Sequence, residues 1–480
     1  MAVLRSPGSR GGSPSSRRGS SRFRRMVVGI LATLGLVFGI GGFAPADAAY
    51  GPVYVSSASV VYGGLSGRPE VSLTIDCGSD LGNANVMLDT LRQNGISATF
   101  GVTGQFAQAN PATASRMVRE GHQIVNHSYD HPSFTGVSDT THVALAREER
   151  WSQLDRAEAA LRADGADSNG WFRPPYGDRD ARVDADVAAD GYSTELMWTR
   201  DTLGWQGIPP AQVVANALRD VHGGSVILMH AGTGSTDYQA LPEIIRQIRD
   251  VYHLGFAAAG DAVVYGEIGN KYRTLGGGHG FLGWPLTIEL DAPNGGRVNR
   301  FHNGSIYWTP VTGADAVYGA IHQKWYDYNG PGGFMGYPLN DESSAANGGR
   351  YNAFQKENAY IYWRADVGAH EVQGVIRAKY ESFGSEWSFL GYPTSDEMDA
   401  GNGSRVSTFQ NGHIYWSTVT GAHEVHGQIL ATYIAAAGPR GPLGMPTSDE
   451  FGITGGRQSN FQHGYITWNA ATGVTEVHHT

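Results

Sequence analysis

Residues 71–80 read VSLTIDCGSD, an apolar run that ends in a carboxylate, a thiol and a glycine. The run of β-branched and apolar residues predicts a buried strand, and its polar end predicts a functional site at the point where the strand stops. Cys77 directly follows Asp76 and is the only cysteine in 480 residues. Because no second cysteine is present for an internal disulfide, the thiol has four interpretations. It is a metal ligand, a nucleophile, a substitution that has damaged the site, or a side chain that only fills space.

Downstream of this stretch, strand-like and helix-like segments alternate as far as residue 264. This alternation indicates βα units around a parallel sheet or barrel, and the length of residues 69–264 suits a somewhat reduced barrel. The strand candidates are VSLTID, SATFGVT, HQIVNH, STELMW and SVILMH, and the helix candidates include NANVMLDTLRQNG, PATASRMVREG, HVALAREERWSQLDRAEAALRADG and PPAQVVANALRDV.

Each predicted strand ends in polar groups that can do chemistry. After VSLTID, the ends read NHSYDH (126–131), FRPPYG (172–177), RDTLGW (200–205) and LMHAG (228–232). In parallel βα folds such strand ends gather at one face, so we expect these groups to share one site.

A histidine pair lies in the second of these ends. His127 and His131 are four residues apart, a spacing that on a helical turn would place both rings on one side, close enough to share a cation. Ser128 stands where a zinc-protease motif has glutamate, so that motif is excluded. Asp130 lies between the histidines and could orient one ring.

The C-terminal half repeats itself with a period of 53 to 55 residues. The period indicates an array of four similar units, each with short β-hairpins and one helix. The unit boundaries are expected near 265–317, 318–372, 373–425 and 426–480. The repeating motif is FLGWPL, FMGYPL, FLGYPT and PLGMPT, with its glycines at Gly283, Gly336, Gly391 and Gly444, and each copy precedes an aromatic segment that ends at Trp308, Trp363, Trp416 or Trp468.

The N-terminus reads as an export signal. Seven arginines precede the apolar run at residues 26–44, and Ala46 and Ala48 form an A-x-A cleavage pattern, so we expect residues 1–49 to be a removed signal peptide. A retained membrane anchor is the alternative. No other segment is long and apolar enough to span a membrane. Residues 50–68 are interpreted as a linker or an added edge strand.

The chain is acidic, with a formal net charge of −10 that becomes more negative once the arginine-rich leader is removed. An acidic surface repels polyphosphates, which excludes nucleic acid as an expected partner.

Taken together, the five strand-end motifs resemble those of the polysaccharide deacetylase family, the NodB-like enzymes of carbohydrate esterase family 4. The resemblance covers residues 69–264 and implies a distorted (β/α) barrel of the NodB type. The C-terminal units resemble LGFP repeats of exported proteins, which implies attachment to a cell-wall polymer.

The resemblance assigns the catalytic groups. Asp76 would be the general base, with Arg173 as its tether, and His230 would be the general acid that protonates the departing amine. Asp201 would orient the imidazole of His230, and the backbone N–H of Tyr176 would stabilise the oxyanion.

It also assigns the remaining site residues. His127 and His131 would bind one divalent metal ion, and Trp205 and Leu228 would line the slot for the acetyl methyl group. Cys77 stands where the family has its metal-binding aspartate. A thiolate ligand favours zinc over harder cations, so the expected cofactor is Zn²⁺. The alternative is that cysteine weakens or abolishes metal binding.

The sequence therefore predicts a secreted, cell-wall-associated, metal-dependent carbohydrate deacetylase, a hydrolase of carbon–nitrogen bonds other than peptide bonds. It would remove N-acetyl groups from a glucosamine-containing glycan, either peptidoglycan or a chitin-like polymer, and its repeats would hold it at the wall. One alternative is an O-acetyl esterase acting on xylan or wall polymers. The other is a non-catalytic wall-binding protein whose deacetylase domain has degenerated at Cys77.

Overall fold

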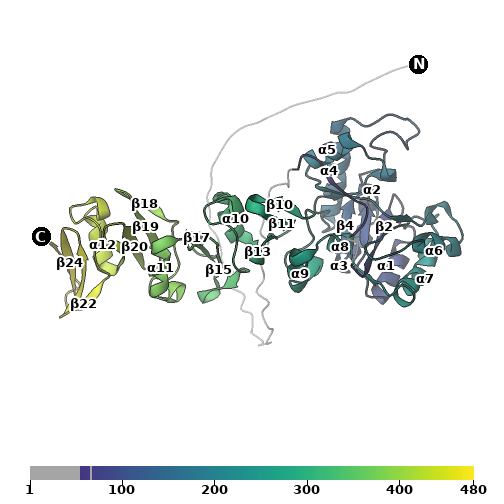
Figure 1. The fold of residues 1–480 in the computed structure, drawn as a ribbon. Coiled ribbons are helices and arrows are strands. Elements are labelled where there is room, and N and C mark those ends of the chain that lie inside the picture. The colour runs from purple at the N-terminus through teal and green to yellow at the C-terminus, as the bar shows by residue number, and fades with distance from the viewer. Residues whose placement is uncertain (1–54, 65–67) are drawn as a thin grey trace, which may run out of the picture. The chain divides into compact units, whose positions relative to one another are not determined.

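The computed structural model describes residues 55–64 and 68–480 (Figure 1). The predicted signal peptide, residues 1–49, lies outside the described residues. In the described part of the chain, no helix has the length and apolarity needed to cross a membrane.

The N-terminal half contains one parallel sheet. Its strands follow the order β1-β6-β5-β4-β3-β2-β8-β7, and β9 pairs with β2. Since the path begins at β1 and ends at β7, the sheet is an open barrel, and the predicted α/β fold is confirmed. The strands are β1 Ser59–Val61, β2 Glu70–Cys77, β3 Thr99–Val102, β4 Gln123–Asn126, β5 Trp171–Phe172, β6 Thr194–Leu196, β7 Arg200–Asp201, β8 Val226–His230 and β9 Gly255–Phe256.

Helices follow most of these strands because their apolar residues recur every three or four positions and pack on the sheet. Met87, Leu88 and Leu91 of α1 join Leu241 and Ile244 of α7 in one apolar cluster with β2. The helices are α1 Ala84–Gln93, α2 Gly104–Ala109, α3 Pro111–Arg119, α4 Arg147–Ala163, α5 Ala181–Ala189, α6 Pro210–Leu218, α7 Asp237–Asp250 and α8 Ala259–Ala262.

The C-terminal half contains four antiparallel four-stranded sheets, and one helix precedes and packs on each of them, as predicted. The units are α9 Gly266–Thr274 with β10 Leu290–Ala292, β11 Gly296–Phe301, β12 Gly304–Thr309 and β13 Gly313–Tyr318; α10 Gly319–Asp327 with β14 Ser343–Ser344, β15 Arg350–Ala353, β16 Tyr360–Arg364 and β17 Gly368–Val372; α11 Gly374–Ser382 with β18 Met398–Gly401, β19 Ser404–Phe409, β20 Gly412–Ser417 and β21 Gly421–His426; and α12 Gly427–Ala435 with β22 Phe451–Ile453, β23 Gly456–Phe461, β24 Gly464–Asn469 and β25 Thr475–His479.

The repeated glycine has the same role in all four units. Its φ lies between 68° and 71°, a left-handed conformation that glycine adopts without strain, and its carbonyl accepts a hydrogen bond from an aromatic side chain of the preceding helix. The four pairs are Tyr272 to Gly283, Trp325 to Gly336, Tyr380 to Gly391 and Tyr433 to Gly444. The motif is thus a tether between helix and sheet.

Consecutive units are joined by a lysine of one helix and an aspartate of the next unit. The Nζ–Oδ2 distances are 2.7 Å for Lys271–Asp341 and 2.8 Å for both Lys324–Asp396 and Lys379–Asp449.

The first repeat shares an apolar cluster with the parallel sheet. Trp171 and Val125 of the sheet lie in the same cluster as Tyr272 and Phe301 of the repeat. The Trp171 indole N–H also donates to the carbonyl of Pro285, inside the first copy of the repeated motif, at 2.7 Å.

Candidate active site

Asp76 lies at the end of β2 and is held by a buried arginine. The Arg173 Nη1 donates to Asp76 Oδ1 at 2.8 Å, and its Nε donates to the carbonyl of Leu196 at 3.0 Å. Arg173 follows β5 and is fully buried, while Asp76 is 7% exposed. These contacts leave the guanidinium little freedom, so the carboxylate is fixed at the strand end.

Opposing effects act on the charge of Asp76. Burial raises its pKa, but the neighbouring Arg173, followed by His127 and His230, lowers it by more, and the pKa lies below its ordinary value. Asp76 is therefore a carboxylate at neutral pH, as a general base must be.

The two predicted histidines meet on a loop and not on a helical turn. Ser128 and His131 both have positive φ angles, 61° and 68°, which fold the chain back after β4. The rings of His127 and His131 have centroids 4.8 Å apart. The four-residue spacing thus brings the rings together through a turn that the helical interpretation did not foresee.

His127 faces the carboxylate with a defined nitrogen. Its Nδ1 lies 2.8 Å from the carbonyl of Arg173, which can only accept, so Nδ1 carries the proton and Nε2 faces Asp76 Oδ2 at 3.4 Å. Burial lowers the pKa of His127, and burial together with the neighbouring His127 lowers that of His131 to about 3. Both rings are therefore neutral near pH 7.

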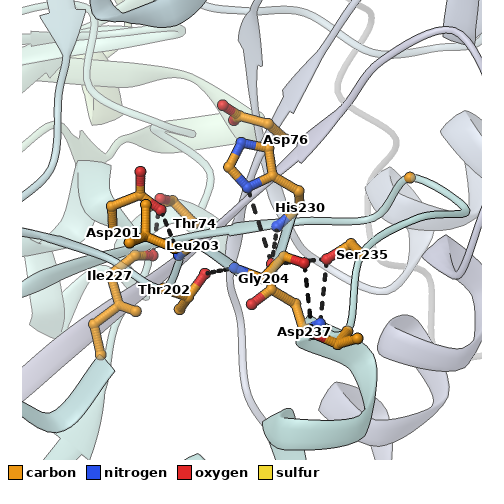
Figure 2. Close-up of polar contacts among 12 residues, drawn as sticks. Thr74, Asp76, Asp201, Thr202, Leu203, Gly204, Ile227, His230, Ser235 and Asp237 are labelled. Carbon is orange, nitrogen blue, oxygen red and sulfur yellow. Dashed lines mark hydrogen bonds and ion pairs between the residues drawn. The ribbon is translucent and has the colours of Figure 1, made fainter. Parts of the chain in front are cut away.

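His230 completes the group from the neighbouring strand. It is the last residue of β8 and is the register partner of Asp76, so the two side chains leave adjacent strands side by side (Figure 2). The cleft in front of them has a volume of about 360 Å³. Predicted site residues that line it are Asp76, His127, His131, Trp205 and His230.

Four other predicted residues do not line the cleft, besides Arg173 behind Asp76. Tyr176 has a positive φ of 61°, and its ring packs against His131 with centroids 4.5 Å apart. Leu228 is buried at 3% exposure, and Asp201 accepts a hydrogen bond from the backbone of Leu203. The fourth is Cys77.

Cys77 is fully buried in the apolar cluster under the sheet. Side chains alternate along a strand, so Cys77 shares a face with Leu73 and Ile75, while Asp76 faces the cleft. Burial, with Asp76 and Asp80 nearby, raises the pKa of the thiol well above its ordinary value, so the sulfur is a protonated thiol.

The predicted metal ligands are consequently not assembled around one point. No group of three histidine, cysteine, aspartate or glutamate side chains in the described residues has the arrangement of a metal site. His127 and His131 could supply two nitrogens to a cation, but a buried, protonated thiol does not fit as their third partner. The predicted set of Cys77, His127 and His131 is thus not brought together.

Sequence reasoning missed two acidic residues. Asp80 lines the cleft three residues after Cys77. Asp237 opens α7, and its Oδ2 lies 3.9 Å from the Nδ1 of His230. The sequence does carry a signal for Asp237. It lies seven positions after the LMH strand end and begins a helix, where the helix N-terminus favours a negative charge.

The site thus combines a carboxylate tethered by Arg173 with an imidazole at adjacent strand ends of a parallel βα sheet, an arrangement that suits acid–base catalysis of a hydrolysis. Residues 64–194 match the family model "Polysaccharide deacetylase". Residues 282–333, 335–388, 390–441 and 443–480 match the model "LGFP repeat".

Three relatives show which enzymes this chain is similar to. A peptidoglycan-N-acetylglucosamine deacetylase of Bacillus cereus is 30% identical over 199 residues, which cover 41% of this chain and 69% of the relative. A chitooligosaccharide deacetylase of Sinorhizobium fredii is 30% identical over 168 residues, with 35% and 74% covered. A peptidoglycan-N-acetylglucosamine deacetylase of Listeria monocytogenes is 31% identical over 164 residues, with 33% and 32% covered.

The chain belongs to the polysaccharide deacetylase family, with LGFP repeats at its C-terminal end. The predicted enzyme class, a carbohydrate deacetylase that hydrolyses carbon–nitrogen bonds, is confirmed.

Proposed function

We propose that the protein removes N-acetyl groups from a glucosamine-containing glycan, with peptidoglycan or a chitin-like polymer as substrate. The observation that carries this proposal is the cleft in which Asp76, held by Arg173, lies beside His230. The similarity to deacetylases of peptidoglycan and chitooligosaccharides supports the substrate class and does not favour the esterase or the non-catalytic alternative.

In the proposed reaction, a water molecule adds to the acetyl carbonyl carbon and gives a proton to the Asp76 carboxylate. The carbon–nitrogen bond then breaks, and the amine nitrogen takes a proton from His230, which leaves acetate and a free amino sugar. Trp205 is 51% exposed at the edge of the cleft, where its ring could stack on a sugar.

The family resemblance implies a divalent cation, which would polarise the acetyl carbonyl. His127 and His131 are the described residues that could contribute nitrogens to it, and Cys77 as placed could not. No step above is therefore assigned to a metal, and Zn²⁺ stays a prediction that the metal content of the purified protein tests.

We further propose that the chain is exported through residues 1–49 and that residues 265–480 hold residues 69–264 at the cell wall. The LGFP matches support the wall attachment. Sedimentation of the full chain with purified cell walls tests it, compared with a chain that ends at Tyr318. Equal sedimentation of the two would contradict attachment through the repeats after the first.

Acetate release from acetylated peptidoglycan and chitooligosaccharides tests the activity. Asp76→Asn keeps the shape but removes the base, so kcat is expected to fall by roughly 10²- to 10⁴-fold. Asp250→Asn, an exposed carboxylate at the end of α7, is the matched control and should keep wild-type activity. Release of acetate at the wild-type rate by Asp76→Asn would overturn the assignment.

A further inference from the structure

His230 lies against a carboxylate that the sequence analysis did not name. We propose that Asp237 is the positioning residue of the active site: its carboxylate orients the His230 imidazole through Nδ1 and leaves Nε2 to face the substrate. Asp237 thus takes the role that the sequence predicted for Asp201. This inference rests on the proposed function of His230 as proton donor.

Asp237 is itself held rigidly. It is the first residue of α7 and has no exposed surface. Its Oδ2 accepts hydrogen bonds from the backbone N–H of His230 at 2.8 Å and from the hydroxyl of Ser235 at 2.9 Å (Figure 2). The same oxygen lies 3.9 Å from His230 Nδ1. One carboxylate oxygen thus contacts both the backbone of His230 and the side of its ring.

The ring nitrogen in question has no other partner. His230 Nδ1 is buried and makes no hydrogen bond to any described residue. A buried polar nitrogen normally has a partner, and hydrogen bonds of catalytic groups are often long before substrate binds. A small rotation of the ring toward Asp237 would convert the 3.9 Å approach into a hydrogen bond.

A glycine makes room for this carboxylate. A Cβ at Gly204 would lie 2.3 Å from Asp237 Oδ1 and 2.4 Å from its Cγ, closer than atoms can approach. Any side chain at this position would therefore push the carboxylate away from His230. Gly204 directly precedes Trp205, so the wall of the cleft and the space for Asp237 come from the same loop.

Asp201 has a different task. Its Oδ1 accepts from the backbone N–H of Leu203 at 2.8 Å, and Leu203 has a left-handed φ of 58°. This contact stabilises the turn after β7. Asp201 is half-buried and does not line the cleft.

Chemically, a carboxylate at Nδ1 fixes the tautomer of the ring and stabilises its protonated form. The proton to be donated is then at Nε2, on the cleft side, where the departing amine needs it. An amine must be protonated to leave, whereas an aryl oxide leaves without a proton. Loss of Asp237 should therefore slow the hydrolysis of amide substrates and have little effect on the hydrolysis of aryl esters.

The first test compares Asp237→Asn with Asp201→Asn in the full chain, on an N-acetylated chitooligosaccharide and on p-nitrophenyl acetate. For Asp237→Asn we expect kcat on the oligosaccharide to fall about 10²-fold or more with little change in KM, and hydrolysis of the aryl ester to change less than about fivefold. Asp201→Asn should not show this selective loss of amide hydrolysis, and Asp250→Asn is the control that should keep wild-type kcat on both substrates.

Gly204→Ala provides a second variant in case Asp237→Asn does not fold. The added methyl displaces the carboxylate without removing it, so the same selective loss of amide hydrolysis is expected. Equal loss on amide and ester, or a selective loss in Asp201→Asn in place of Asp237→Asn, would overturn the proposal.

A readout without substrate separates this inference from the proposed function. The ¹⁵N chemical shifts of His230 report which ring nitrogen carries the proton. The wild type should show an Nδ1–H tautomer, and Asp237→Asn should shift the ring toward a mixture. If the wild type releases no acetate, the proposed function fails, but the tautomer still tests the positioning role of Asp237. An unchanged tautomer in Asp237→Asn would refute that role.

Discussion

At the end of β2, neighbouring residues face opposite sides of the sheet and have opposite environments. Asp76 faces a polar cleft and is stabilised as an anion by Arg173. Cys77 faces the apolar cluster and is stabilised as a neutral thiol. The period of two in a strand thus accounts for why adjacent residues in the sequence do not share a site.

The position of Cys77 predicts how its variants behave. Cys77→Ala should keep the wild-type metal content and activity and lower the free energy of unfolding by about 1 kcal/mol, because only a small cavity is created. Cys77→Asp should lower it by several kcal/mol, because a carboxylate enters an apolar cluster. Elemental analysis and urea unfolding measure both effects. Loss of metal in Cys77→Ala would show that the sulfur is a ligand after all.

His122 predicts a dependence of stability on pH. It is 3% exposed, and burial lowers its pKa to about 4. Glu120 opposes this shift, whereas His279 and Arg116 add to it. The unfolded chain binds a proton at this residue below about pH 6.5, whereas the folded chain does so only near pH 4. Stability is therefore lost as the pH falls from 6.5 to 4, by roughly 3 kcal/mol in total.

His122→Gln is the variant that isolates this effect, because glutamine does not titrate and can still accept from the backbone N–H of Ala98, as His122 Nδ1 does. Urea unfolding between pH 7 and 4.5 should give a flatter curve for the variant than for the wild type. A constant difference between the two curves would contradict the prediction.

Among the elements, the tether between helix and repeated glycine is the feature that every repeat shares. Tyr380→Phe removes the hydroxyl that donates to Gly391 at 2.7 Å and leaves a carbonyl without its partner. The expected loss of unfolding free energy is about 1–3 kcal/mol. The control is Tyr351→Phe on β15, since the Tyr351 hydroxyl makes no hydrogen bond to a described residue and its loss should cost under about 0.5 kcal/mol. Equal effects would show that the tether does not stabilise the unit.

At the scale of elements, the sequence predicted those features that depend on the periodicity of apolar residues or of repeated motifs. The apolar runs predicted β2, β3, β4, β6 and β8 within one or two residues, since burial on both faces needs such runs. The 53- to 55-residue period predicted the four units.

Periodicity could not identify which carboxylate faces His230. Asp201 and Asp237 both lie just after or near a strand end, and only the path of two loops turns one toward the ring. The role of Gly204 could not be predicted from the sequence either, because it depends on a contact with Asp237 of α7.

For the whole molecule, the shared cluster predicts where the chain can be cut. A chain that ends at Val264 would expose Trp171 and leave its indole N–H without Pro285. It should melt at a lower temperature and aggregate more than a chain that ends at Tyr318, which keeps the first repeat. Thermal unfolding and light scattering compare the two chains. Equal melting temperatures would show that the first repeat is not part of the folding unit.

Because Cys77 is buried, its thiol is a natural probe of unfolding. A thiol reagent can reach this sulfur only when β2 separates from α1 and α7, so the rate of alkylation measures how often the parallel sheet opens. Residues 265–480 contain no cysteine and are silent in the same measurement. Mass spectrometry of one labelled peptide would therefore follow the opening of the deacetylase domain separately from that of the repeats, without an engineered label.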